Sequence, residues 1–94
     1  MKKKDIRILL VDDDADILEI VGYNLSQEGY QISTAINGRE AIAKAKKVLP
    51  HLIIMDVMMP NMDGIEACGL LRKDPRFKET IIMFLTARGE DYSH

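Results

Sequence analysis

The sequence has 94 residues, of which 47% are hydrophobic and 30% charged, and its net charge at pH 7 is −2. These values are typical of one small globular domain, and the absence of a basic excess argues against a nucleic-acid-binding module. The single cysteine, Cys68, rules out an internal disulfide and a cysteine-rich metal site, and no apolar run is long enough to span a membrane. We therefore expect a cytoplasmic protein.

The first half of the chain predicts a strand, a helix and a second strand. Residues 6–11 are apolar except for Arg7, and such a short apolar run is typical of a buried strand. Asp12-Asp13-Asp14 follows directly. Residues 15–28 have helical spacing, with Asp14 as the expected N-cap and Gly29 as the expected stop. Residues 30–36 then predict a shorter strand.

The second half continues the alternation of helices and strands. Residues 39–48 predict a helix that ends before Pro50, residues 52–56 a second buried strand, and residues 64–73 a helix capped by Asp63. Residues 80–85 predict a fourth strand, and residues 88–94 the start of a further helix. Such alternation predicts a parallel sheet with helices on both of its faces.

Each expected helix carries one apolar stripe that should face the core. The stripes are Ile17, Leu18, Val21 and Leu25 on the first helix, Ala41, Ile42, Ala45 and Val48 on the second, and Ile65, Cys68 and either Leu71 or Leu70 on the third. Gly69 should weaken the third helix by roughly 1 kcal/mol relative to alanine. The lysines at positions 2–4 are expected to form a solvated tail.

Polar residues follow three of the expected strands where those strands end: Asp12 and Asp13, then Asp56, then Thr86. If the first and third strands are neighbours, the three aspartates meet where the strand order reverses, which is where ligands bind in open parallel sheets. Clustered carboxylates repel one another, and a hard divalent cation such as Mg²⁺ relieves that repulsion. A carboxylate beside such an ion can act as a nucleophile toward a phosphoryl group.

A simpler interpretation exists for each of these residues, because acidic residues at strand ends are commonly just solvated. Asp14 and Asp16 are best explained as capping and helix-dipole residues. The methionines at 55, 58, 59 and 62 are most simply core and loop residues, although the Met58 carbonyl could also bind a metal. Three carboxylates converging on one sheet edge are much harder to explain by chance.

Three segments in this order resemble the receiver domain of bacterial two-component response regulators. They are residues 8–14, residues 55–64 with Asp56 near the start, and Leu85-Thr86-Ala87. The resemblance implies a flavodoxin-like, doubly wound α/β fold whose parallel sheet has the strand order 2-1-3-4.

The resemblance also implies a role for each site residue. Asp56 would accept a phosphoryl group from a sensor histidine kinase, and Thr86 would hydrogen-bond that group and report its presence. Asp13, Asp56 and the Met58 carbonyl would hold Mg²⁺, with Asp12 acting through the water shell of the ion. The protein would be a signalling domain that switches conformation, with self-dephosphorylation as its only possible catalytic activity.

The family pattern continues through a fourth helix, a fifth strand bearing a lysine at its end, and a fifth helix, whereas this sequence ends at His94. We therefore expect residues 1–94 to be a receiver domain that is incomplete at its C-terminus. The parent protein would carry an output domain, commonly a DNA-binding one, while this chain would bind neither nucleic acid nor membrane. Residues 80–85 would form an unpaired apolar sheet edge, which predicts a homodimer or a segment-exchanged assembly.

Three other functions agree with parts of this sequence. A phosphohydrolase of the haloacid dehalogenase type would use Asp12 as nucleophile and Asp14 as acid, but it leaves residues 55–64 unexplained. A flavodoxin-like cofactor binder needs a phosphate-cradling loop after the first strand, where this chain has three repelling aspartates. A pseudo-receiver, which interacts without being phosphorylated, stays open because of the missing lysine.

Overall fold

The computed structural model describes residues 1–59 and 62–85 of the chain. The elements are β1 (Arg7–Val11), α1 (Ala15–Gln27), β2 (Gln31–Ala35), α2 (Gly38–Val48), β3 (Leu52–Asp56), α3 (Gly64–Arg72) and β4 (Ile81–Leu85), with single 3₁₀ turns at Lys3–Asp5 and Pro75–Phe77. All seven predicted helices and strands within these residues are confirmed to within a residue or so at each end. The helix expected at residues 88–94 lies outside the described residues.

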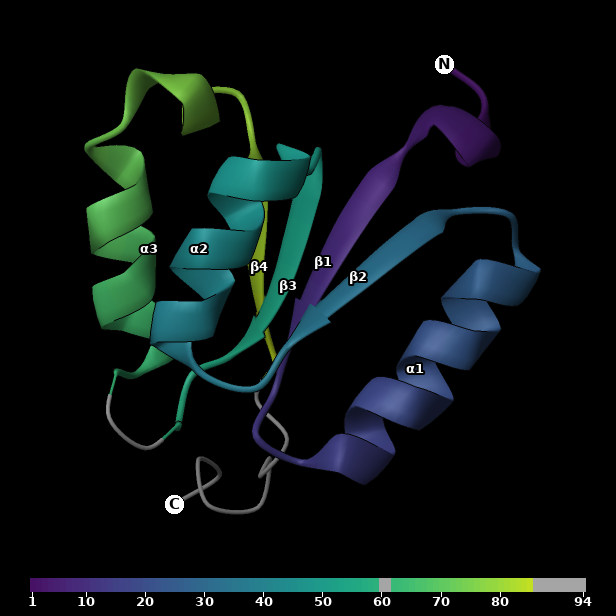
Figure 1. Ribbon diagram of the computed structural model, residues 1–94, viewed down its shortest axis with the longest axis horizontal. Helices are drawn as coiled ribbons and strands as arrows, with labels where there is room; N and C mark the ends of the chain where they lie inside the picture. Colours follow the sequence, from purple (N-terminus) through teal and green to yellow (C-terminus); the bar gives the residue numbers. More distant parts are fainter. Residues whose placement is uncertain (60–61, 86–94) are drawn as a thin grey trace, which may run out of the picture.

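The four strands form one parallel sheet in the order β2-β1-β3-β4, as the resemblance implied. Helices α2 and α3 lie on one side of this sheet and α1 lies on the other, as Figure 1 shows. The chain therefore winds to one side of β1 and then returns to the other side of it, so the strand order reverses between β1 and β3. That reversal places the carboxyl ends of β1 and β3 next to each other.

The core lies between the sheet and the α2–α3 layer. Alternate strand residues, namely Leu9 and Val11 on β1 and Ile53 and Met55 on β3, are fully buried in it. The helices contribute mainly small side chains to this cluster, and their buried members are Ala41, Ala45, Ala67 and Leu71. Because alanines let the helix backbones approach the sheet closely, the layer packs tightly under the two strands that end in aspartates.

Each α-helix begins at a side chain that satisfies one of its free N–H groups. Asp14 accepts a hydrogen bond from the Asp16 N–H at 2.9 Å, which confirms its predicted role as N-cap of α1. Asn37 does the same for Glu40 at 2.8 Å, so α2 begins at Gly38, one residue earlier than expected. Asp63 caps α3 through the Glu66 N–H, also at 2.8 Å. Such caps contribute about 1 kcal/mol each.

The predicted stripe of α3 is wrong in part. Ile65 is exposed, and Ala67 is buried in its place, while Cys68 is half-buried against the core as expected. Of the two leucines that the sequence left open, Leu71 is buried at 1% exposure and Leu70 is 41% exposed. The buried face of α3 runs through Gly64, Ala67 and Leu71, and α3 contacts α2, which leaves Ile65 on the exposed side of the helix.

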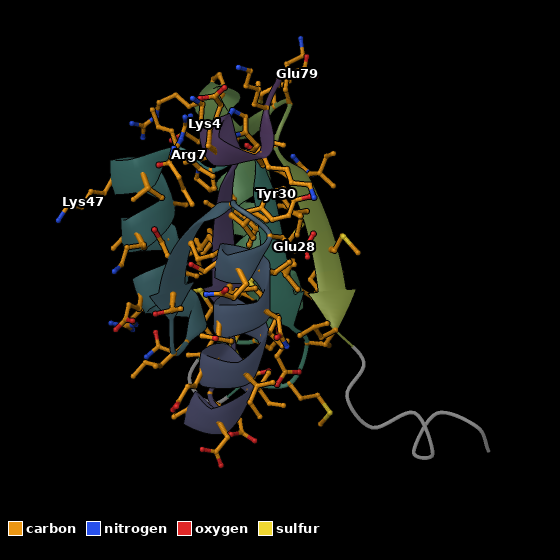
Figure 2. The ribbon with its side chains drawn as sticks, turned by 90° about the vertical axis from the view of Figure 1, so that its right-hand side faces the viewer. Lys4, Arg7, Glu28, Tyr30, Lys47 and Glu79 are labelled. Carbon is orange, nitrogen blue, oxygen red and sulfur yellow. The ribbon has the colours of Figure 1, made fainter. Side chains whose placement is uncertain are left out.

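The other face of the sheet is covered less completely. The predicted α1 stripe is only half-buried, and α1 packs mainly over β1 and β2. Within the described residues, β4 is an edge strand, and its side chains Ile81 and Met83 are exposed. Figure 2 shows β4 at the edge of the molecule, with α1 in front of the rest of the sheet. No helix in this part of the chain is long and apolar enough to cross a membrane.

The N-terminal lysines are more ordered than the predicted solvated tail. Lys3 and Lys4 lie in the 3₁₀ turn, and the Lys3 ammonium pairs with the Glu28 carboxylate at 3.0 Å. Figure 2 shows Tyr30 just above Glu28, with Lys4 nearer the end of the molecule where β1 begins. Since both partners of the ion pair are exposed, it stabilises the fold only slightly.

The two leucines of α3 test which face of that helix is buried. Leu71→Ala should destabilise the protein by about 3 kcal/mol, because it removes a buried side chain and leaves a cavity. The matched change Leu70→Ala should cost less than about 1 kcal/mol, because Leu70 already contacts solvent. Urea denaturation of the two variants measures both values. Equal losses would contradict the packing of α3 described above.

Candidate functional site

The reversal of strand order brings three carboxylates together. In the β1–β3 pairing Val11 lies opposite Met55, so Asp12 and Asp56 come next on two adjacent parallel strands. Asp12, Asp13 and Asp56 each offer a carboxylate oxygen, and these oxygens lie within 4.8 Å of one another. The convergence predicted from the sequence is therefore present in the structure.

Two of these carboxylates are buried and held by backbone N–H groups. Asp12 is 3% exposed and Asp56 is 6% exposed, whereas Asp13 is exposed. One oxygen of Asp12 accepts a hydrogen bond from the Asp14 N–H at 2.9 Å, and one oxygen of Asp56 accepts from the Met58 N–H at 3.1 Å. These bonds orient both side chains toward the same small volume at the sheet edge.

The electrostatics of the cluster favour a cation. Burial raises the pKa of the Asp12 carboxyl above its usual range, and the nearby charges of Asp56, Asp13 and Asp14 raise it further, against the opposing hydrogen bond from the Asp14 N–H. The ion pairs formed by the described residues are Lys3 with Glu28 and Arg76 with Asp74, so none of them neutralises the cluster. The donor set consists of carboxylate oxygens, which suits a hard divalent cation.

A glycine positions the loop that follows Asp56. The Gly64 N–H donates to the Val57 carbonyl oxygen at 2.9 Å, which closes the loop between β3 and α3. A Cβ atom at position 64 would overlap the carbonyl oxygen of Asp56 and lie 3.2 Å from the Val57 Cα atom. The sequence predicted Gly64 as the start of a helix and as the last residue of the segment 55–64 that carries the family resemblance, but not this close approach to the backbone of Asp56.

The remaining predicted site residues are placed as follows. Met58 is exposed in the loop after β3, one hydrogen bond from Asp56. Thr86 lies outside the described residues, and the last described residue, Leu85, pairs with Asp56 across β3 and β4. The Asp14 carboxylate is engaged in capping α1, so the structure does not place it in the cluster.

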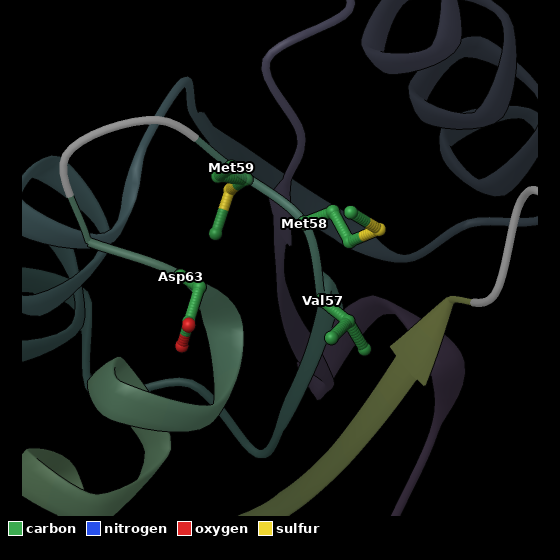
Figure 3. Close-up of a pocket in the computed structure, with 4 residues that line it drawn as sticks. All are labelled: Val57, Met58, Met59 and Asp63. Atoms are coloured by element: carbon green, nitrogen blue, oxygen red, sulfur yellow. The ribbon is translucent and has the colours of Figure 1, made fainter.

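An open hollow of about 460 Å³ adjoins this loop and is lined by Val57, Met58, Met59 and Asp63. Figure 3 shows that the Met58 side chain points away from those of Met59 and Asp63. None of the three clustered aspartates lines this hollow, so it lies beside the acidic cluster rather than over it.

Comparison with known proteins agrees with this arrangement. The family described as response regulator receiver domain matches residues 8–93. The chain belongs to this family. Receiver domains are signalling domains of two-component systems, and membership favours that role over the phosphohydrolase and flavodoxin-like alternatives.

Over the aligned residues, individual relatives are between a third and a half identical to this receiver domain. It is 43% identical over 86 residues to the alkaline phosphatase synthesis transcriptional regulatory protein PhoP of Bacillus subtilis, and 45% identical over 87 residues to the transcriptional regulatory protein ResD of the same organism. These matches cover 92% and 93% of this chain but 35% of each relative, so the chain spans about a third of their length.

Solved structures share the fold. Chemotaxis response regulator CheY4 of Vibrio cholerae superposes with a TM-score of 0.82 at 37% identity, covering 93% of this chain and 75% of that one. A chain from the complex of histidine kinase ThkA with response regulator protein TrrA superposes with a TM-score of 0.79 at 43% identity, covering 95% of this chain and 72% of that one.

Because Gly64 lies against the backbone of Asp56 and the space beside Gly69 is open, alanine at these two positions of α3 should change the stability of the protein in opposite directions. Gly64→Ala should destabilise the protein by about 2 kcal/mol, because the new Cβ atom must displace the backbone at Asp56. Gly69→Ala, where a Cβ meets no atom within 4 Å, should instead stabilise α3 by up to about 1 kcal/mol. Urea denaturation measures both changes. A neutral Gly64→Ala variant would show that the loop can move away from Asp56 at little cost.

Proposed function

We propose that Asp56 is the phosphoacceptor of this receiver domain. The observation that carries the proposal is the cluster of Asp12, Asp13 and Asp56, in which one carboxylate ends the central strand β3. Asp56 is held in place by the Met58 N–H and is shielded by burial, so its free oxygen can be presented to phosphorus in one orientation. In the proposed transfer, a carboxylate oxygen of Asp56 bonds to phosphorus while the bond from phosphorus to a kinase histidine nitrogen breaks.

We assign Mg²⁺ to the acidic cluster. Asp13, Asp56 and the Met58 carbonyl would bind the ion, and Asp12 would bind it directly or through its water shell. When bound, the ion supplies positive charge that neutralises the carboxylates and the incoming phosphoryl oxygens. The raised pKa of Asp12 is in keeping with this assignment: burial is its main cause, and the neighbouring charges of Asp56 and Asp13, which a cation would offset, add to it. Thr86 would hydrogen-bond the phosphoryl group, and slow attack of water on the acyl phosphate would return the domain to its resting state.

The partner in this proposal is a sensor histidine kinase, and the exchange takes place in the cytoplasm. Family membership supports the partner, as does the likeness to a chain from the ThkA–TrrA complex. The curated relatives are transcriptional regulators of which this domain spans about a third, so we propose that the domain controls an output domain such as a DNA-binding one. With a net charge of −2, this chain itself would make no direct contact with nucleic acid.

The acceptor can be identified by intact mass after incubation with acetyl phosphate and Mg²⁺. The wild-type chain should gain one phosphoryl group, Asp56→Asn should gain none, and Asp63→Asn should behave as wild type, because Asp63 only caps α3. Omitting Mg²⁺ should abolish the adduct through the repulsion between the carboxylates and the donor phosphate. An adduct that persists in Asp56→Asn would assign the acceptor to another residue, and Asp12 would then support a phosphohydrolase.

If the wild-type chain binds Mg²⁺ but forms no adduct, the domain is a pseudo-receiver. Binding of Mg²⁺ alone can be followed by the rise in melting temperature that it causes, since an ion that binds only the folded protein stabilises it. That measurement separates an assembled but inactive site from a site that does not bind the metal.

We further propose that the chain associates with a second copy through β4. This strand lies at the edge of the described sheet, and its exposed Ile81 and Met83 continue an apolar hollow lined by Ile8 and Ile54. An edge strand presents unpaired N–H and C=O groups, and two such edges can pair about a two-fold axis.

A charge on the exposed face of β4 should weaken this association. Met83→Lys should shift the protein toward monomer in sedimentation equilibrium, because two lysines would face each other across the paired edges. Glu19→Lys, on the exposed surface of α1, is the control for a change in net charge. A wild-type chain that stays monomeric at high concentration would refute the proposal.

A further inference from the structure

The methionines around the acidic cluster differ sharply in exposure. Met58 is 57% exposed, whereas Met59 is 8% exposed and Met55 is fully buried. Met1 and Met83 are also exposed, but neither lies in the loop that follows Asp56. Met83 lies within β4, and it is Leu85, two residues later, that pairs with Asp56. Met58 is therefore the methionine that combines open access to solvent with a position in the loop beside the proposed acceptor.

A hydrogen bond couples Met58 directly to that acceptor. Its N–H donates to a carboxylate oxygen of Asp56 at 3.1 Å, so the backbone of Met58 is fixed relative to the carboxylate. The side chain leaves this anchored backbone toward the surface and away from Met59 and Asp63 (Figure 3). A chemical change at the Met58 sulfur thus takes place two residues from the phosphoacceptor, in the exposed loop at the rim of the site.

Exposed thioethers react with peroxides. In this reaction a bond forms between the methionine sulfur and one oxygen of hydrogen peroxide while the O–O bond breaks, so the sulfur is oxidised by two electrons. The second peroxide oxygen is reduced and leaves as water with both hydrogens. The product is a sulfoxide, which turns an apolar side chain into a polar one with an oxygen that accepts hydrogen bonds.

We propose that Met58 is a peroxide-sensitive site and that its sulfoxide shortens the lifetime of the phosphoryl group on Asp56. The inference rests on the proposed function of Asp56. A thioether at the rim offers water no strong hydrogen-bond partner, whereas a sulfoxide oxygen holds water there. Since the acyl phosphate is lost by attack of water, a hydrated rim should increase the rate of that loss. Peroxide would in this way reduce signalling without removing the acceptor or the metal ligands.

The test compares oxidised and unoxidised protein within each variant. The full chain is treated with limiting hydrogen peroxide, the oxidised methionines are mapped by peptide mass, and the phosphoryl group is then loaded from acetyl phosphate with Mg²⁺. Met58 and Met1 should oxidise, Met83 should oxidise to the extent that β4 is unpaired, and Met55 and Met59 should stay protected. The lifetime of the phosphoryl group should fall by about threefold or more in the oxidised wild type.

Two variants show whether the shorter lifetime of the phosphoryl group is caused by oxidation of the Met58 sulfur. In Met58→Leu, the oxidised and unoxidised lifetimes should be equal, whatever the basal lifetime of that variant. In Met83→Leu, the fall should persist, because the similarly exposed Met83 is not bonded to the acceptor. An unchanged melting temperature after oxidation shows that the fold is intact.

The outcomes are distinct. A normal adduct whose lifetime is unaffected by oxidation, or a fall that persists in Met58→Leu, would overturn the inference and leave the proposed function standing. Failure of the unoxidised chain to form an adduct at Asp56 would overturn the proposed function, and the inference with it.

Discussion

Parallel pairing of β1 with β3 is the constraint on which the rest of this structure depends. It places Asp12 and Asp56 on neighbouring strand ends, and both carboxylates are buried there. Burying like charges side by side opposes folding, and the raised pKa of Asp12 reflects this cost. The pairing is nevertheless retained because Leu9, Val11 and Ile53 on the same strands are fully removed from water. Hydrophobic burial thus holds together a charged site that would not assemble by itself.

The two sides of the sheet have different roles. On one side, α2 and α3 pack closely through alanines, the Gly64 N–H bonds the Val57 carbonyl, and Asp63 caps α3. This side holds the backbone around Asp56 in one conformation. On the other side, α1 lies mainly over β1 and β2, and apolar side chains of β4 stay exposed. In this way one side of the sheet holds the backbone of the acidic site, while the other side keeps apolar surface available for contact with a partner.

Much of the fold could be predicted because its signals are local. Short apolar runs that end in aspartate mark β1 and β3, and Asp14 and Asp63 mark the starts of their helices. The buried face of α3 could not be predicted in this way. Ile65 lies three residues before Cys68, a spacing that a helical stripe allows, whereas the face that is buried in the structure runs through Gly64, Ala67 and Leu71. The strand order came from the family resemblance, because periodicity carries no information on which strands are neighbours.

The sequence by itself therefore determined the elements, the presence of three carboxylates at strand ends, and the family. The tertiary structure decided which of the acidic residues converge: Asp12, Asp13 and Asp56 meet within 4.8 Å, while Asp14 turns away to cap α1. It also decided that Gly64 must lack a side chain, since the backbone of Asp56 occupies the space. The physical reason is the same in both cases. Contacts between segments far apart in the chain depend on how strands and helices are stacked, and no local pattern encodes that stacking.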